Sequence, residues 1–393
     1  MVRVSRGAAG AAVALAVATT VAAAAPASPP ARRPHPTLAT APSWRLSALD
    51  QEWLRSGRVP GWGTEWEDMV EYALLDLRAL VAPSGGPLAG AAPSWGYVWP
   101  RDAAFVAAAF ARTGHLADAD RVLAFLARAQ ETDGGFEARY LPNGSGPPDA
   151  RRRQSDGAGW ALWAVASVAA VSEPGVVARR YESLVRRATL FALRQTEDGT
   201  RLPRPSPDYW ERPETAVTLG TAAPLLLGLR SGAALLAEVD AAAAARAAGA
   251  AESFGRLVAL RFGSGGYQRY GPSGGADAAV AFLLPPFAAE DDDVVRAWRH
   301  YQTSALRPAG GLAPGAGWYR DGVSWTPQTA LVALTAAASG RRATAERWLG
   351  WLDEHRTQWG SLPEKVLADG SPAGPAPLAW TAATVVLAVD ALG

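Results

Sequence analysis

The chain has 393 residues, of which 49% are hydrophobic, and its 38 basic side chains nearly balance 37 acidic ones. A net charge of +1 gives no basic field for a nucleic-acid backbone, so we expect no nucleic-acid partner. The absence of cysteine excludes disulfides and thiolate sites, and four scattered histidines argue against a zinc cluster. Sixteen tryptophans provide flat aromatic faces that suit sugar rings as well as protein cores.

Residues 1–27 have the layout of a secretory signal peptide. Arg3 and Arg6 precede an uncharged run dominated by Ala and Val, and small residues follow at the expected cleavage site. A membrane anchor is the alternative, but this run is weakly hydrophobic and has no stop-transfer pattern. The Pro-rich stretch over 28–50 predicts an extended linker. We therefore expect a secreted protein, without membrane contact after cleavage, whose one large domain covers 51–393.

From Thr64 onward, apolar residues recur at helical spacing almost to the C-terminus. The pattern predicts twelve helices. The first begins at Thr64, and the others lie near 102–113, 116–131, 155–171, 174–195, 214–228, 232–261, 275–286, 291–306, 325–339, 341–358 and 376–392.

The predicted helices alternate between two kinds. Helices such as 341–358 are charged on one side, whereas helices such as 159–171 are apolar all round and have to be enclosed by others. Six enclosed and six exposed helices predict an all-α fold, an (α/α)6 barrel. Short links, such as the one at Ser231, alternate with long ones, so the long links are expected at one end, where a site would form.

Those long links carry the unusual polar residues. Asp102 is placed to cap an inner helix, and Arg101 beside it needs a polar partner in the barrel mouth. The three arginines at 151–153 are interpreted as a solvated run, while Gln154 and Asp156 are expected to reach the cavity.

Two glutamates, Glu211 and Glu364, enter the same predicted mouth from separate loops. Two carboxylates among aromatic residues are typical of a glycosidase, in which one protonates the leaving oxygen and the other acts on water or the sugar carbon. A solvated surface glutamate is the alternative interpretation for each of them.

Four motifs occur in order, each at the entry of an inner helix: YVWPRD at 97–102, QSDG at 154–157, DYWE at 208–211 and LPE at 362–364. Together they resemble the signature loops of glycoside hydrolase family 15, the glucoamylase-like enzymes, over roughly residues 64 to 390. The resemblance implies an inverting hydrolase of α-linked glucosides that acts from the non-reducing end of an oligo- or polysaccharide.

The resemblance also assigns roles to residues. It makes Glu211 the general acid, with a raised pKa, and Glu364 the general base, with a lowered one. It implies a substrate-binding set of Trp99, Arg101, Asp102, Gln154, Asp208, Trp210 and Arg320, in which the two tryptophans form pocket walls and Asp208 supports the acid loop. No cofactor or metal is implied, and we expect a monomer.

The sequence departs from the family pattern at three positions. Arg212 follows the acid where a second glutamate is frequent, and Lys365 follows the base where glutamine is usual. The order Tyr319-Arg320 replaces the usual Arg-Tyr, so the role of Arg320 is the least supported. Two other functions stay open: a non-catalytic carbohydrate-binding protein on the same scaffold, and a terpene-cyclase-type α-barrel using the acidic run 290–293.

Overall fold

The computed structural model describes residues 47–173 and 175–393. The predicted signal peptide over 1–27 and most of the predicted linker over 28–50 lie outside these residues. The last three residues of that linker are helical, because α1 (Ala48–Ser56) starts there with the side chain of Ser47 accepting a hydrogen bond from the Asp50 N–H.

Six elements form a closed inner ring, in which each contacts the next and the last contacts the first. They are α3 (Pro100–Arg112), α5 (Gly157–Ala169), α8 (Leu219–Leu236), the 3₁₀ turn η3 (Ala278–Leu283), α11 (Thr326–Ala338) and α13 (Ala379–Leu392). The predicted (α/α)6 barrel is thus confirmed.

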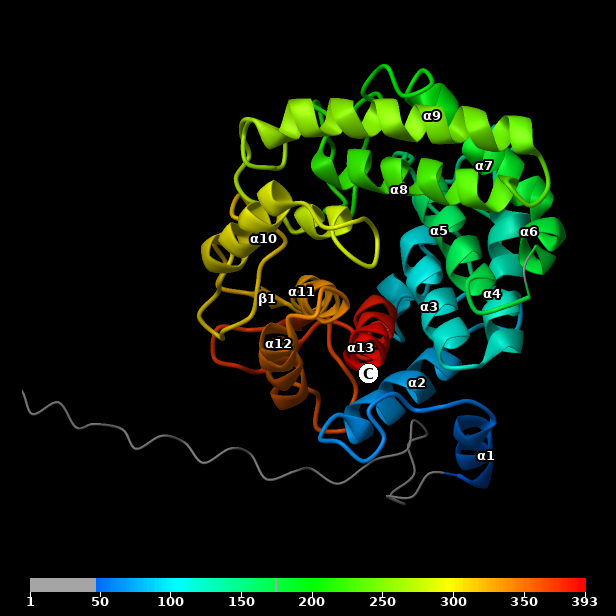
Figure 1. Ribbon diagram of the computed structural model, residues 1–393. Coiled ribbons are helices and arrows are strands. Elements are labelled where there is room, and N and C mark those ends of the chain that lie inside the picture. The colour runs from blue at the N-terminus through cyan, green and yellow to red at the C-terminus, as the bar shows by residue number, and fades with distance from the viewer. Residues whose placement is uncertain (1–46, 174) are drawn as a thin grey trace, which may run out of the picture. The chain divides into compact units, whose positions relative to one another are not determined.

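The outer ring covers this inner ring from outside (Figure 1). It consists of α2 (Glu67–Leu80), α4 (Leu116–Ala129), α7 (Glu182–Gln195) preceded by α6 (Val176–Arg180), α9 (Ala241–Val258), α10 (Asp292–Ser304) and α12 (Arg342–Glu354). The remaining elements are η1 (Pro93–Trp95), the π-helical turn η2 (Ala259–Gly263) and three short strands, β1 (Ser324–Trp325), β2 (Lys365–Val366) and β3 (Pro372–Ala373), paired antiparallel in that order.

Small residues allow the inner helices to approach closely. A Cβ added at Gly159 of α5 would lie 2.0 Å from the carbonyl oxygen of Pro224 in α8. A Cβ at Gly228 of α8 would in turn lie 2.6 Å from the Cα of Gly159. These helices are therefore packed backbone against backbone, and larger side chains at either glycine would push the ring open.

One helix in the described part of the chain, α8, is long and apolar enough to cross a membrane. Its apolar window is 83% buried within the barrel, where it contacts α5, α7 and α9. Its composition is accounted for by enclosure in the inner ring.

Two predicted boundaries are wrong. The helix expected over 275–286 is only the turn η3, because Pro285 and Pro286 follow it and cannot donate the N–H groups that a longer helix needs. The link expected at Ser231 lies instead at 237–240, since α8 runs through Gly232, where a Cβ would meet Thr189 Oγ1 at 2.4 Å. That glycine serves close packing on α7 rather than helix termination.

Asp76 of α2 is fully buried and accepts a hydrogen bond from Ser361 Oγ at 3.1 Å. Burial raises the pKa of Asp76 to about 8, although Ser361 and Arg356 oppose the rise. The folded state therefore holds a proton that the unfolded chain releases near pH 4. This contribution to stability is complete below the unfolded pKa and is lost as the pH rises through about 8.

We predict that Asp76→Asn removes this pH dependence, because the amide keeps the acceptor for Ser361 and carries no charge. Urea unfolding at pH 8 should show the variant more stable than the parent by on the order of a few kcal/mol. Near pH 4 the two proteins should differ far less. A difference that stays constant between these pH values would contradict the assignment.

Candidate active site

A cavity of about 210 Å³ opens at the barrel end where the long links meet. The six long links, numbered in chain order, cover 81–99, 130–156, 196–218, 264–277, 305–325 and 355–378. All but the fourth supply the cavity wall, together with the starts of inner helices. Its aromatic and charged lining residues include Trp95, Trp99, Arg101, Asp102, Arg139, Arg151, Trp210, Glu211, Trp318, Trp325, Glu364, Lys365 and Trp380. Both predicted catalytic glutamates thus face one aromatic cavity.

Glu211 lies at the end of a tight turn in the third link. The Glu211 N–H donates to the carbonyl oxygen of Asp208 at 2.8 Å, and the carboxylate of Asp208 accepts from the Trp210 N–H at 2.9 Å. Glu211 itself has φ of +55°, a left-handed conformation that side-chain-bearing residues seldom adopt. Such backbone strain persists only where surrounding contacts impose it.

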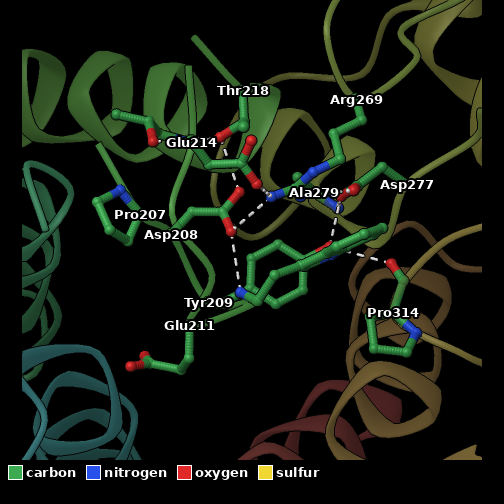
Figure 2. A network of polar contacts seen from close by, with 12 residues as sticks. Pro207, Asp208, Tyr209, Glu211, Glu214, Thr218, Arg269, Asp277, Ala279 and Pro314 are labelled. Carbon is green, nitrogen blue, oxygen red and sulfur yellow. Dashed lines mark hydrogen bonds and ion pairs between the residues drawn. The ribbon is translucent and has the colours of Figure 1, made fainter. Parts of the chain in front are cut away.

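The surrounding contacts centre on Arg269, a fully buried residue of the fourth long link (Figure 2). Its Nη2 donates to Asp208 at 2.9 Å and to Glu214 at 2.7 Å, while Nη1 donates to Asp277 at 2.9 Å. The guanidinium also stacks on Trp210, 3.7 Å from the ring centroid.

The anions of this cluster are held from other sides as well. Thr218 Oγ1 donates to Asp208 at 2.7 Å, Tyr270 Oη donates to Glu214 at 2.8 Å, and Tyr209 Oη donates to Asp277. Figure 2 shows Glu211 pointing away from this network, toward the other side of its loop. The network therefore positions the turn without touching the carboxylate that it presents.

The Glu211 carboxylate accepts hydrogen bonds from three side chains. Oε1 accepts from Gln154 Nε2 at 2.7 Å and from Trp99 Nε1 at 3.1 Å, and Oε2 accepts from Arg151 Nη1 at 2.9 Å. Arg101 Nη2 lies 3.6 Å from Oε1. The carboxylate is thus surrounded by donors contributed by the first and second links.

Glu364 lies in the sixth long link and is held by its backbone. Its N–H donates to the Pro375 carbonyl at 2.9 Å, and its own carbonyl accepts from the Thr326 N–H at 3.1 Å. Gly374 passes so close that a Cβ there would lie 2.6 Å from Glu364 Oε2, which, with its φ of +75°, requires glycine.

The side chain of Glu364 is buried, and one oxygen forms an ion pair with Lys365 Nζ at 3.0 Å. Burial raises the pKa of Glu364 above its ordinary value, the Lys365 ammonium opposes the rise, and Asp102 adds to it. The lowered pKa that we expected for this residue is therefore wrong, because removal from water outweighs the lysine. Lys365 itself also lies over the Trp325 ring, 4.5 Å from its centroid.

Arg101 and Asp102 occupy the first turn of α3 and are both buried. Trp99, rather than Asp102, is the N-cap residue, so the capping role predicted for Asp102 is wrong. Burial raises the pKa of Asp102 to about 6, with Arg101 opposing the rise. Within the described residues, Arg101 Nε and Nη1 have no hydrogen-bond partner, and its guanidinium lies 4.8 Å from the Trp380 ring centroid.

The other predicted site residues divide into three groups. Trp99 and Trp210 line the cavity as expected, and Gln154 reaches it through Glu211. Asp208 is buried behind the turn, so it supports the acid loop but does not contact the cavity. Arg320 is exposed and lies outside the cavity lining, which removes the basis for a substrate contact.

Sequence reasoning missed several residues here. Arg151 was interpreted as solvated, yet it holds Glu211, and Arg269 was not singled out at all. No local pattern marks Arg269, because its partners Asp208 and Glu214 are 61 and 55 residues away in the sequence. Aromatic spacing in the fifth link could have indicated Trp318 and Trp325, which both line the cavity.

The acidic run at 290–293 has a structural explanation. Asp291 is the N-cap of α10 and accepts from the N–H groups of Asp293 and Val294, while Glu290 pairs with Arg341. Among the described residues, no group of three or more His, Asp or Glu is arranged to hold a metal ion. These contacts remove the support for a terpene-cyclase-type site.

Comparison with known proteins adds information about the fold. No family model and no curated protein matches the sequence. The chain is similar to a glycosidase variant solved in complex with glucose, with a TM-score of 0.73 and 20% identity, over 88% of this chain and 99% of the other.

Two glucoamylases are also similar. A bacterial glucoamylase complexed with acarbose gives a TM-score of 0.72 and 17% identity over 87% of this chain and 57% of the other. A family 15 glucoamylase from Hypocrea jecorina gives 0.65 and 16% over 87% and 72%. Identities this low show the fold alone, so the resemblance to family 15 glucoamylases is confirmed at the level of the barrel.

We predict that Arg269→Gln destabilises the protein and abolishes the activity of the site, because three buried carboxylates lose their shared cation. Breaking a buried ion pair by removing one partner costs about 3–5 kcal/mol, measurable by urea unfolding. Arg246→Gln is the matched control, since Arg246 pairs with Asp198 on the surface and is 54% exposed. Equal stability losses in the two variants would contradict the central role of Arg269.

Proposed function

We propose that this chain is an inverting glycoside hydrolase that removes glucose from the non-reducing end of α-linked glucosides. The observation that supports this most strongly is that Glu211 and Glu364, from separate loops, line one small cavity walled by tryptophans. A shared barrel with glucoamylases is consistent with the proposal.

In the proposed reaction, the terminal sugar occupies the cavity against the tryptophan faces, with Arg101 and Asp102 hydrogen-bonded to its hydroxyl groups. The unpartnered N–H groups of the buried Arg101 need such acceptors. The aromatic rings supply apolar contact for the sugar faces and exclude water from them.

Glu211 then donates its proton to the glycosidic oxygen as the bond from that oxygen to the anomeric carbon breaks. A water molecule attacks the anomeric carbon from the opposite face and gives its proton to Glu364. One proton leaves the enzyme and one returns, and the configuration inverts. This geometry needs roughly 6.5–9.5 Å between the carboxyl groups, which leaves room for the water.

The surroundings of Glu364 suit a general base. The raised pKa of a buried carboxylate makes its ionised form a better proton acceptor, while the ion pair with Lys365 helps keep it ionised. Lys365 therefore belongs to the proposed machinery rather than to the solvated surface.

A non-catalytic carbohydrate-binding protein is the second candidate. The observation that favours it is the hydrogen bond that Arg151 Nη1 donates to Glu211 Oε2 at 2.9 Å, because it engages the carboxylate that a hydrolase would use as its acid. A binding protein would take up sugar without releasing product, so titration calorimetry and product analysis on one sample separate the two candidates. We further propose that the protein is secreted, from the signal-like composition of residues 1–27.

We predict that Glu211→Gln and Glu364→Gln each lower kcat by about 10²–10⁴-fold with little change in thermal stability. Assays with maltose, isomaltose, trehalose and soluble starch would identify the linkage, and NMR would show β-glucose released first. Glu354→Gln, an exposed position at the end of α12, should behave like the parent. Near-normal turnover in Glu211→Gln, or α-glucose as the first product, would refute the mechanism.

We predict that Lys365→Met moves the acidic limb of the kcat–pH profile to higher pH. The base has to be ionised, so activity is lost as the pH falls through the pKa of Glu364, and the Lys365 ammonium is the group that lowers this pKa. Lys365→Arg keeps the charge and should leave the limb near its parent position. An unmoved or downward-shifted midpoint in Lys365→Met would show that the ion pair has no role.

A further inference from the structure

Three of the roughly four lone-pair positions of the Glu211 carboxylate accept hydrogen bonds from other side chains in the described part of the chain. Oε2 accepts from Arg151 Nη1, and a guanidinium can only donate. Oε1 is occupied by Gln154 Nε2 and by the indole N–H of Trp99. A proton on Oε2 would share that oxygen with the Arg151 guanidinium, so Glu211 is freed for its proposed role when Arg151 takes another partner.

Arg151 is the donor that can leave. Its side chain is 40% exposed, it lies in an irregular stretch of the second link, and its other ionic partner is Asp149 at 3.4 Å. Gln154, by contrast, is buried, and Trp99 is buried at the N-cap of α3. Arg151 can therefore change partner without any movement of the barrel.

A second arginine lies beside Arg151. Arg139 is buried between the rings of Tyr97 and Trp99, with its Cζ 4.0 Å and 5.1 Å from their centroids, and it pairs with the same Asp149. Within the described part of the chain, Arg139 Nε has no hydrogen-bond partner. Two guanidinium groups thus share a single partly exposed carboxylate at the rim.

Arg139 and Arg151 lie near the carboxylate that acts on the leaving group in the proposed reaction. Glu211 delivers its proton to the leaving oxygen, so groups on its solvent side face the part of the substrate that departs. Arg101 and Asp102 are buried at the start of α3, whereas the Arg151 side chain is 40% exposed. Arg139 and Arg151 both line this cavity, and together they share the Asp149 carboxylate.

From this geometry, and resting on the proposed function, we infer that the preferred substrate is an α-glucoside whose leaving group carries a carboxylate or phosphate. The anion takes the place of Glu211 as the partner of Arg151, while Arg139 supplies a second donor. Glu211 Oε2 is released and takes up the proton that it then transfers to the glycosidic oxygen. A neutral leaving group offers Arg151 no such exchange, so the acid stays paired for more of the time.

Two matched pairs of substrates test the inference with the full-length protein. Maltobionate and maltitol both have open-chain leaving groups and differ in the carboxylate, whereas trehalose 6-phosphate and trehalose differ in the phosphate. Glucose release gives kcat/KM for each compound. We expect an anionic member to be preferred by about ten-fold or more, which is the effect of one charge-assisted hydrogen bond. The pair that shows the preference identifies the anion.

Variants of the arginine run assign the effect to Arg151. Arg151→Gln should bring the anionic-to-neutral ratio of kcat/KM close to one, whatever the turnover of the neutral member becomes. Arg151→Lys should retain part of the preference. Arg152→Gln, the exposed neighbour, should keep the ratio of the parent.

The outcomes separate this inference from the function on which it rests. Hydrolysis of neutral glucosides as fast as of both anionic ones, or an unchanged ratio in Arg151→Gln, would overturn the inference and leave the hydrolase intact. Lack of hydrolysis of all four compounds, together with lack of hydrolysis of maltose and starch, would overturn both.

Discussion

The site depends on one buried cation. Arg269 compensates three carboxylates that the barrel removes from water, and none of them would be tolerated there alone. One of the three, Asp208, also fixes the turn that carries Glu211 in its left-handed conformation. A charge cluster outside the cavity lining thereby positions the turn that carries the Glu211 carboxylate. Because the cost of removing these charges from water offsets much of their attraction, the main effect of the cluster is to hold the turn in place.

The two cavity glutamates are treated differently by their surroundings. Glu211 is positioned through its side chain by donors from two other loops, and its own side chain is 25% exposed. Glu364 is positioned through its backbone, is almost fully buried, and faces a single ammonium. A carboxylate with movable partners suits a group that gains and loses a proton near solvent, and a rigid buried one suits a group that orients water.

Much of the fold could be predicted, because the distribution of apolar and charged residues within each helix indicates whether that helix is enclosed or exposed. What could not be predicted depends on distant packing. The link expected at Ser231 does not form, because α8 continues through Gly232, where the absence of a side chain allows close contact with Thr189. In the run 151–153 the sequence gives three identical residues, and only the folded loops show that Arg151 meets Glu211, 60 residues away, while Arg152 stays exposed. The motifs marked both glutamates but not Arg269, which supports one of them.

The cavity is lined by side chains of two kinds, those at the starts of inner helices and those on the long links. In the proposed reaction, a group assigned to the sugar, such as Arg101, belongs to the first turn of an inner helix and is fixed by the ring. A group assigned to the leaving group, such as Arg151, is a partly exposed loop side chain. Substitutions there change charge at the rim at little cost to folding, since exposed ion pairs contribute at most about 1 kcal/mol. The barrel shared at 20% identity therefore shows the fold, whereas the proposed choice of leaving group depends on rim side chains that can vary without changing that fold.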